Sequence, residues 1–150
     1  MPGLIDHVDA IARRTGRDVL YLEFHPQPYR EWRAYRHEDD ATRMRVLAWL
    51  DAHGFRWQAC GPFADPAVMA PWLGQVWLDV AFDETLADYR RLRDYLELPD
   101  GSMRHSGVRF CVMPVAYANR NAEHDVPGFW ERWAEDLWSP LSSGDPRPPD

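Results

Sequence analysis

Short segments in which apolar and polar residues alternate are the feature that most constrains the fold of this chain. Four such segments lie at residues 19–25, 55–60, 75–82 and 108–117. Alternation with a period of two is typical of a β-strand that buries one face, so we expect four strands. Pro26 and Pro28 follow the first strand and end it, because proline cannot donate to a strand ladder. Pro114 places the end of the fourth strand at a sheet edge or a bulge.

Helical patterns separate the predicted strands. Apolar residues recur at helical spacing over residues 3–15. A second helix is expected from an N-cap at Asp39 or Asp40 to a C-cap at Gly54, and a third runs from Asp83 to about residue 98. Pro127 suits the first turn of a last helix, which is rich in tryptophan.

The order of these elements predicts an α+β fold. After the leading helix, the order strand, helix, strand, strand, helix, strand is that of a ferredoxin-like βαββαβ antiparallel sheet. Right-handed crossovers then give the strand order 4-1-3-2, with both central helices on one face. We expect a single domain over residues 1–138, with an extra N-terminal helix and a C-terminal Trp-rich helix. Residues 139–150 are rich in proline and are expected to form a flexible tail.

Composition excludes several functional classes. The chain has 150 residues and a formal net charge of −7, which disfavours nucleic acid as a partner. No run of about 18–20 apolar residues is present, and the first residues do not resemble a signal peptide, so we expect a cytoplasmic protein without a membrane partner. All 17 basic residues are arginine, so clusters of arginine carry less weight here than usual.

Each strand has two faces, and the alternation assigns residues to them. We call the apolar side the first face, and we expect it to meet the two central helices. It comprises Leu20, Leu22, Phe24, Phe55, Trp57, Val76, Leu78, Val80, Phe82, Val108, Phe110 and Val112. The other side, the second face, is mixed polar and aromatic and is expected to be open. It comprises Tyr21, Glu23, His25, Arg56, Gln58, Cys60, Trp77, Asp79, Arg109, Cys111 and Met113.

Charged residues form a row across the second face. In the predicted strand order the row reads Arg109, Glu23, Asp79, Arg56. One interpretation is a solvated face with cross-strand pairs. Another is a concave site, partly roofed by the N-terminal helix or the Trp-rich last helix, in which Glu23 and Asp79 lie close together and one carboxyl pKa is raised. A third is the interface of a homodimer, where two-fold symmetry makes the patch self-complementary. The row depends on register, because a one-residue slip of any strand destroys it.

An arginine-rich, aromatic connection follows the first strand. It includes Arg30, Trp32 and Arg33, in a chain that is acidic overall. These side chains suit an anionic ligand or the carboxylates of a partner. They equally suit the acidic residues at 38–40 of this chain.

Histidine and cysteine spacing favours no metal site. None of the six histidines occurs in a metal-binding motif, and His25 could meet Cys60 only on neighbouring strands. Cys60 and Cys111 lie on opposite edges of the predicted sheet, about 14 Å apart, so both should be reduced thiols. The chain also lacks a phosphate-binding loop and a serine-hydrolase motif. We therefore assign no cofactor, metal or catalytic residue.

Two functional hypotheses remain open. The first is a binding or regulatory module that recognises a protein partner, as an immunity protein would, or a second copy of itself. The second face or the Trp-rich end would make the contact. The alternative is a small-molecule-binding protein or enzyme with a pocket on the second face. Glu23 or Asp79 would then serve as the acid–base group, and Arg56 or Arg109 would hold an anion.

Overall fold

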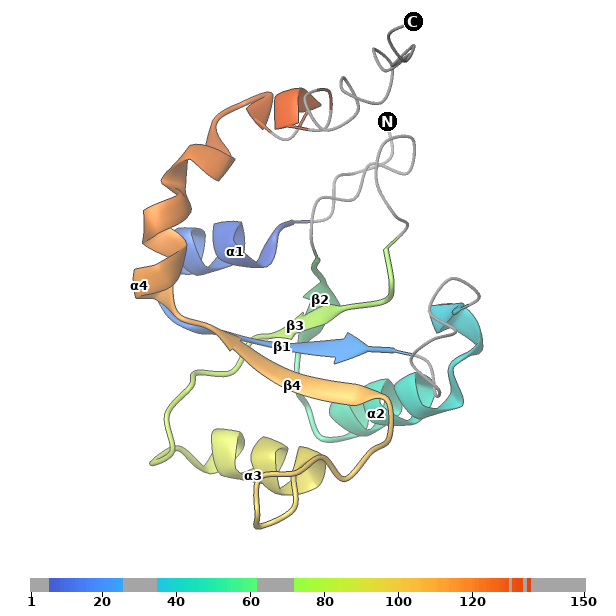
Figure 1. Cartoon of the computed structure of the whole chain (residues 1–150). Coiled ribbons are helices and arrows are strands. Elements are labelled where there is room, and N and C mark those ends of the chain that lie inside the picture. Colours follow the sequence, from blue (N-terminus) through green and yellow to red (C-terminus); the bar gives the residue numbers. More distant parts are fainter. Residues whose placement is uncertain (1–5, 26–34, 62–71, 130, 134, 136–150) are drawn as a thin grey trace, which may run out of the picture.

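The computed structural model describes residues 6–25, 35–61, 72–129, 131–133 and 135 (Figure 1). The helices are α1 (Val8–Thr15), α2 (Ala41–Ala52), α3 (Ala87–Leu96) and α4 (Val115–Ala118). The strands are β1 (Val19–Phe24), β2 (Trp57–Ala59), β3 (Val76–Leu78) and β4 (Val108–Met113). Two 3₁₀ segments, η2 (His37–Asp39) and η3 (Asn119–Asp125), complete the described elements.

The four strands form one antiparallel sheet in the order β2-β3-β1-β4. This is the predicted order, written from the other edge. The fold is therefore α+β, as the order of the strand and helix patterns predicts. The two long strands, β1 and β4, pair over their whole length from Val19 opposite Met113 to Phe24 opposite Val108.

The first face of the sheet is covered by α2 and α3, which lie on the same side of it (Figure 1). Leu22 and Val76 have no exposed surface, and they belong to a core that also takes Leu50 of α2 and Leu92 of α3. Burying a side chain of this size contributes roughly 1.5–3 kcal/mol to folding. Most of the residues predicted for the first face are confirmed in this core.

Two residues predicted for that core are exposed instead. Phe82 is 43% exposed because β3 ends at Leu78 and the chain has left the sheet before it reaches this ring. Val112 is 38% exposed because it lies on β4, which is an edge strand. Trp57 is only partly buried, and its indole N–H donates to the carboxylate of Asp51 at 2.8 Å.

The second face is not open along its whole length. At one end α1 and the α4–η3 segment cover it (Figure 1), so that Trp77 and Cys60 are buried with Ile11 of α1 and Ala118 of α4 in a second, smaller core. A hydrogen bond from the backbone N–H of Val115 to Asp18, at 2.8 Å, holds the start of α4 beside β1. The second face is therefore open only in part, and the N-terminal helix is one of the two helices expected to roof it, because the apolar stripe of α1 needs a surface to cover.

Several element boundaries also differ from prediction. The fourth strand ends at Met113, and Pro114 becomes the N-cap of α4 instead of a strand residue. Asp40 caps α2 as predicted, accepting hydrogen bonds from the N–H groups of residues 42 and 43. Asp83 instead closes a turn with Thr85, and α3 begins after Leu86.

The C-terminal predictions are only partly covered by the described residues. Phe129 and residues 131–133 are helical, in line with a helix after Pro127. Trp130, Trp138 and the predicted tail at 139–150 lie outside the described residues. No described helix is both long enough and apolar enough to cross a membrane.

Candidate functional site

The predicted charged row on the second face is present as two separate pairs. Glu23 lies directly opposite Arg109, and the carboxylate and guanidinium are 3.5 Å apart. Arg56 is the neighbour of Asp79, whose backbone N–H donates to the Arg56 carbonyl at 3.1 Å. Each neighbouring pair was predicted correctly, but the two pairs lie at different positions along the strands and do not form one row across the sheet.

The register of β1 and β3 keeps the two acidic residues apart. Tyr21 stands opposite Trp77, so Asp79 lies beside Val19, four residues along β1 from Glu23. Four residues of strand span about 13 Å. Asp79 forms an ion pair with Arg17 instead. The expected close approach of Glu23 to Asp79 was therefore wrong, whereas the role of either residue alone as an acid–base group stays a prediction.

The middle of the second face holds aromatic and thiol side chains whose pKa values are raised. Tyr21 pairs with Cys111 on one side and with Trp77 on the other. Burial raises the pKa of Tyr21 to about 12 and that of the Cys60 thiol to about 12, and it also raises the pKa of Cys111. Both cysteines are free thiols in the structure. At neutral pH they stay protonated, which makes them poor nucleophiles.

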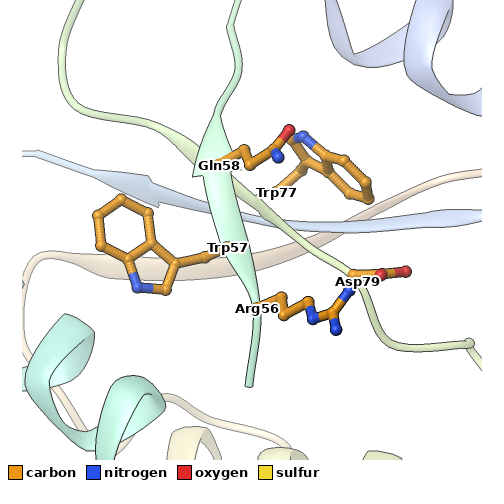
Figure 2. Close-up of a pocket in the computed structure, with 5 residues that line it drawn as sticks. All are labelled: Arg56, Trp57, Gln58, Trp77 and Asp79. Carbon is orange, nitrogen blue, oxygen red and sulfur yellow. The ribbon is translucent and has the colours of Figure 1, made fainter. Parts of the chain in front are cut away.

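A shallow pocket lies beside the Arg56–Asp79 neighbours. It is lined by Arg56, Trp57, Gln58, Trp77 and Asp79, and its empty volume is about 280 Å³ including space open to solvent. Figure 2 shows Gln58 and Trp77 on one side of β2, the side chains of Arg56 and Asp79 next to each other, and Trp57 on the opposite side of the strand. The cavity itself has a volume of about 90 Å³, well below the roughly 300–1,000 Å³ of most small-molecule sites.

The remaining predicted site residues lie at or beyond the end of β1. The backbone N–H of His25 donates to the Gly107 carbonyl at 3.0 Å, which extends the pairing of β1 with β4. Its side chain is half-buried. Arg30, Trp32 and Arg33 lie outside the described residues, so the arginine-rich connection stays a prediction.

A concentrated group of ionisable side chains lies elsewhere in the described part of the chain, where α1 meets η3. The carboxylate of Asp9, only 1% exposed, has a histidine on each oxygen. His7 Nδ1 is 2.5 Å from Oδ1, and His124 Nδ1 is 2.6 Å from Oδ2. We call these three residues the His–Asp–His cluster. It joins the N-terminal end of α1 to a segment more than a hundred residues away in the chain.

Arg13 supports this cluster from the side of α1. Its guanidinium lies 3.2 Å and 3.3 Å from the two oxygens of Asp9 and makes two 2.6 Å contacts with Asp125. A fourth bond runs to the backbone carbonyl of Ala118 at 2.7 Å. Burial by itself would raise the pKa of Asp9, but His7, Arg13 and His124 outweigh it and lower that pKa. Asp9 is therefore a buried carboxylate held in its charged form.

The sequence carried only weak signals for this cluster. His7 and Asp9 are two residues apart, which no metal or catalytic motif requires, and His124 comes from the other end of the chain. An acid on the buried side of an amphipathic helix was one available signal, since Asp9 lies between Val8 and the apolar pair Ile11 and Ala12. A buried acid needs a partner, and Arg13, one helical turn later, is the local candidate.

Comparisons with protein-family models, with curated proteins and with solved structures found no match for this chain.

Proposed function

We propose that this chain is a protein-binding module, that its contact element is the exposed edge of β4, and that the occupant of this edge is a second copy of the chain. The observation that carries the proposal is a six-residue edge strand with an exposed apolar side chain, Val112, and no neighbouring strand among the described residues.

The backbone of β4 supports this proposal. In an antiparallel pair, residues alternate between those that bond to the partner strand and those whose N–H and C=O groups point away. The bond from His25 to Gly107 sets the phase of that alternation. Arg109, Cys111 and Met113 then bond to β1. The backbone polar groups of Val108, Phe110 and Val112 then point away from β1. Val108 is only 2% exposed, so the part of the edge open to another strand lies at Phe110 and Val112.

The side chains along this edge are self-complementary. An antiparallel two-fold pairing that sets Phe110 of one copy against Val112 of the other covers apolar surface on both copies. The same register sets Cys111 opposite its own equivalent. Arg109 is the only charged side chain of β4, and Glu23 of the same chain lies 3.5 Å from it. A charged side chain at a strand edge disfavours pairing with another strand. Because Glu23 compensates its charge, Arg109 opposes such pairing less than an unpaired arginine would.

We also propose that the topology is ferredoxin-like. The element order and the placement of α2 and α3 on one side of the sheet (Figure 1) support it. In this topology β4 is an edge strand, which agrees with the binding proposal.

The pocket at Arg56 and Asp79 favours a second candidate, a site for a small anionic molecule. Arg56 would hold the anion, and Trp77 would provide an apolar wall. Of the two acid–base candidates only Asp79 lines this pocket, and its carboxylate is already paired with Arg17. We rank it below the binding module for this reason.

The oligomeric state in solution tests the main proposal. We expect the full chain to be a dimer by size-exclusion chromatography with light scattering, and the Val112→Lys variant to be a monomer, because a charged residue at a strand edge disfavours pairing. Val126→Lys is the matched control, since Val126 is a 50% exposed valine that lies outside β4. Circular dichroism verifies that both variants fold.

A disulfide test examines the register. Mild oxidation should join two copies of the wild-type chain through Cys111, and Cys111→Ser should stop this although Cys60 remains. A wild-type chain that stays monomeric at high micromolar concentration, or a Val112→Lys variant that stays dimeric, would overturn the proposal.

A further inference from the structure

The His–Asp–His cluster has the composition of a transition-metal site. Its three residues can each offer one ligand atom, and these atoms lie within 4.8 Å of one another. Two imidazole nitrogens and one carboxylate oxygen form a donor set that suits zinc and the divalent ions near it in the transition series. Three protein ligands also leave a coordination position open, as in catalytic zinc sites.

The groups around the cluster have a charge that a divalent ion can balance. With both histidines neutral, the negative charges are those of Asp9 and Asp125, and the positive charge is that of Arg13. The group then carries one net negative charge in a half-buried place. Arg13 contacts Asp9 and is itself held by Asp125, so it orients the carboxylate in the way that second-layer partners orient metal ligands.

Metal binding requires a small rearrangement of the two imidazoles. Two ligands at zinc distances of about 2.0–2.2 Å stand about 3.3 Å apart at a tetrahedral angle. The present contacts of 2.5 and 2.6 Å are shorter, as expected for hydrogen bonds to a carboxylate. The two Nδ1 atoms must therefore draw back from the Asp9 oxygens, and each imidazole must carry its proton on Nε2. The side chains of His7 and His124 are about one-fifth exposed, so solvent reaches both imidazoles.

We infer that His7, Asp9 and His124 bind one divalent transition-metal ion, with zinc as the reference ion. Bound metal would clamp the start of α1 to η3, because His7 and Asp9 belong to one and His124 to the other. This inference does not depend on the β4 edge.

Titration of the full chain with zinc chloride tests the inference. By isothermal titration calorimetry, we expect one site per chain with micromolar affinity or better, and a rise in the unfolding temperature when zinc is present. His124→Gln and His7→Gln should each weaken zinc binding by at least tenfold. Glutamine keeps a hydrogen-bond donor for Asp9, so these variants separate loss of a ligand from loss of a structural contact.

His53→Gln is the matched control, because His53 is an exposed histidine at the end of α2. It should bind zinc as the wild type does. Equal binding by the wild type and the His7→Gln, His124→Gln double variant would overturn the inference. Absence of binding by a folded wild-type chain would do the same. Absorption of the Co²⁺-loaded protein gives a second readout, which should show tetrahedral or five-coordinate bands that the double variant lacks.

Discussion

The two faces of the sheet are stabilised in different ways. The first face is covered by α2 and α3 over one continuous apolar core. On the second face, a smaller apolar core lies beneath α1 and α4, with the His–Asp–His cluster at its margin. At the other end of that face the Glu23–Arg109 pair reaches solvent, with the Arg109 side chain 65% and the Glu23 side chain 35% exposed. Residues of the second face are therefore buried or open to solvent according to whether α1 and α4 lie above them.

Adjacent residues of β1 give the largest expected contrast between the two faces. Leu22 is fully buried in the first core, and Leu22→Ala should cost about 2–5 kcal/mol of unfolding free energy. Glu23→Ala should cost less than about 1 kcal/mol, because the Arg109 guanidinium is exposed and water screens its ion pair with Glu23. Urea unfolding of the two variants measures the difference. Equal losses would mean that the exposed end of the second face is packed against something the described residues do not include.

A second contrast lies within the second face, between two aspartates. Asp9→Asn removes the charge that accepts from His7, His124 and Arg13, and we expect a loss of about 2 kcal/mol. Asp79→Asn removes only the exposed pair with Arg17 and should cost less than about 1 kcal/mol. Thermal and urea unfolding at low and high salt measure both. Salt should shrink the Asp79 effect and leave the Asp9 effect nearly intact. A reversed order would show that Asp9 is not the centre of the network.

Periodicity predicted the sheet better than it predicted the second face. The strand order and the pairs Glu23–Arg109 and Arg56–Asp79 follow from alternation and from the order of elements. The separation of Glu23 from Asp79 depends on the register of β1 against β3, which no local pattern sets.

The burial of Trp77 and the His–Asp–His cluster were harder to predict for a different reason. Both depend on where α1 and η3 dock, and those docking contacts join residues far apart in the chain. The apolar face of an amphipathic helix indicates that the helix packs against another surface, but it does not indicate which surface that is. Asp9 could have been recognised as a buried acid, whereas its partner His124 could not.

The smallest expected effect concerns pH and His105, on the side of the molecule that the first core occupies. Burial lowers the pKa of His105, and Arg45 and Arg104 add to this effect against the hydrogen bond to the Tyr95 carbonyl, which raises the pKa. Its Nε2 donates to the Tyr95 carbonyl at 3.1 Å, and its Nδ1 faces the Arg45 guanidinium at 3.5 Å, so the neutral imidazole fits the site. The unfolded chain binds a proton at this residue more readily than the folded one does. Stability should therefore be intact above about pH 6.5 and fall as the pH drops below it.

Comparing wild type with His105→Gln between pH 7 and pH 5 isolates this contribution. Glutamine can still donate to the Tyr95 carbonyl but does not titrate, so the variant should lose less stability over that range. Part of the dependence of stability on pH should persist in the variant, because burial also lowers the pKa of His37. Arg45→Gln serves as the control: it removes a neighbouring positive charge and should reduce the slope without abolishing it. If wild type and His105→Gln fell in parallel, the imidazole would be as easily protonated in the folded chain as in the unfolded one, and its burial against Tyr95 would contribute nothing to the pH response.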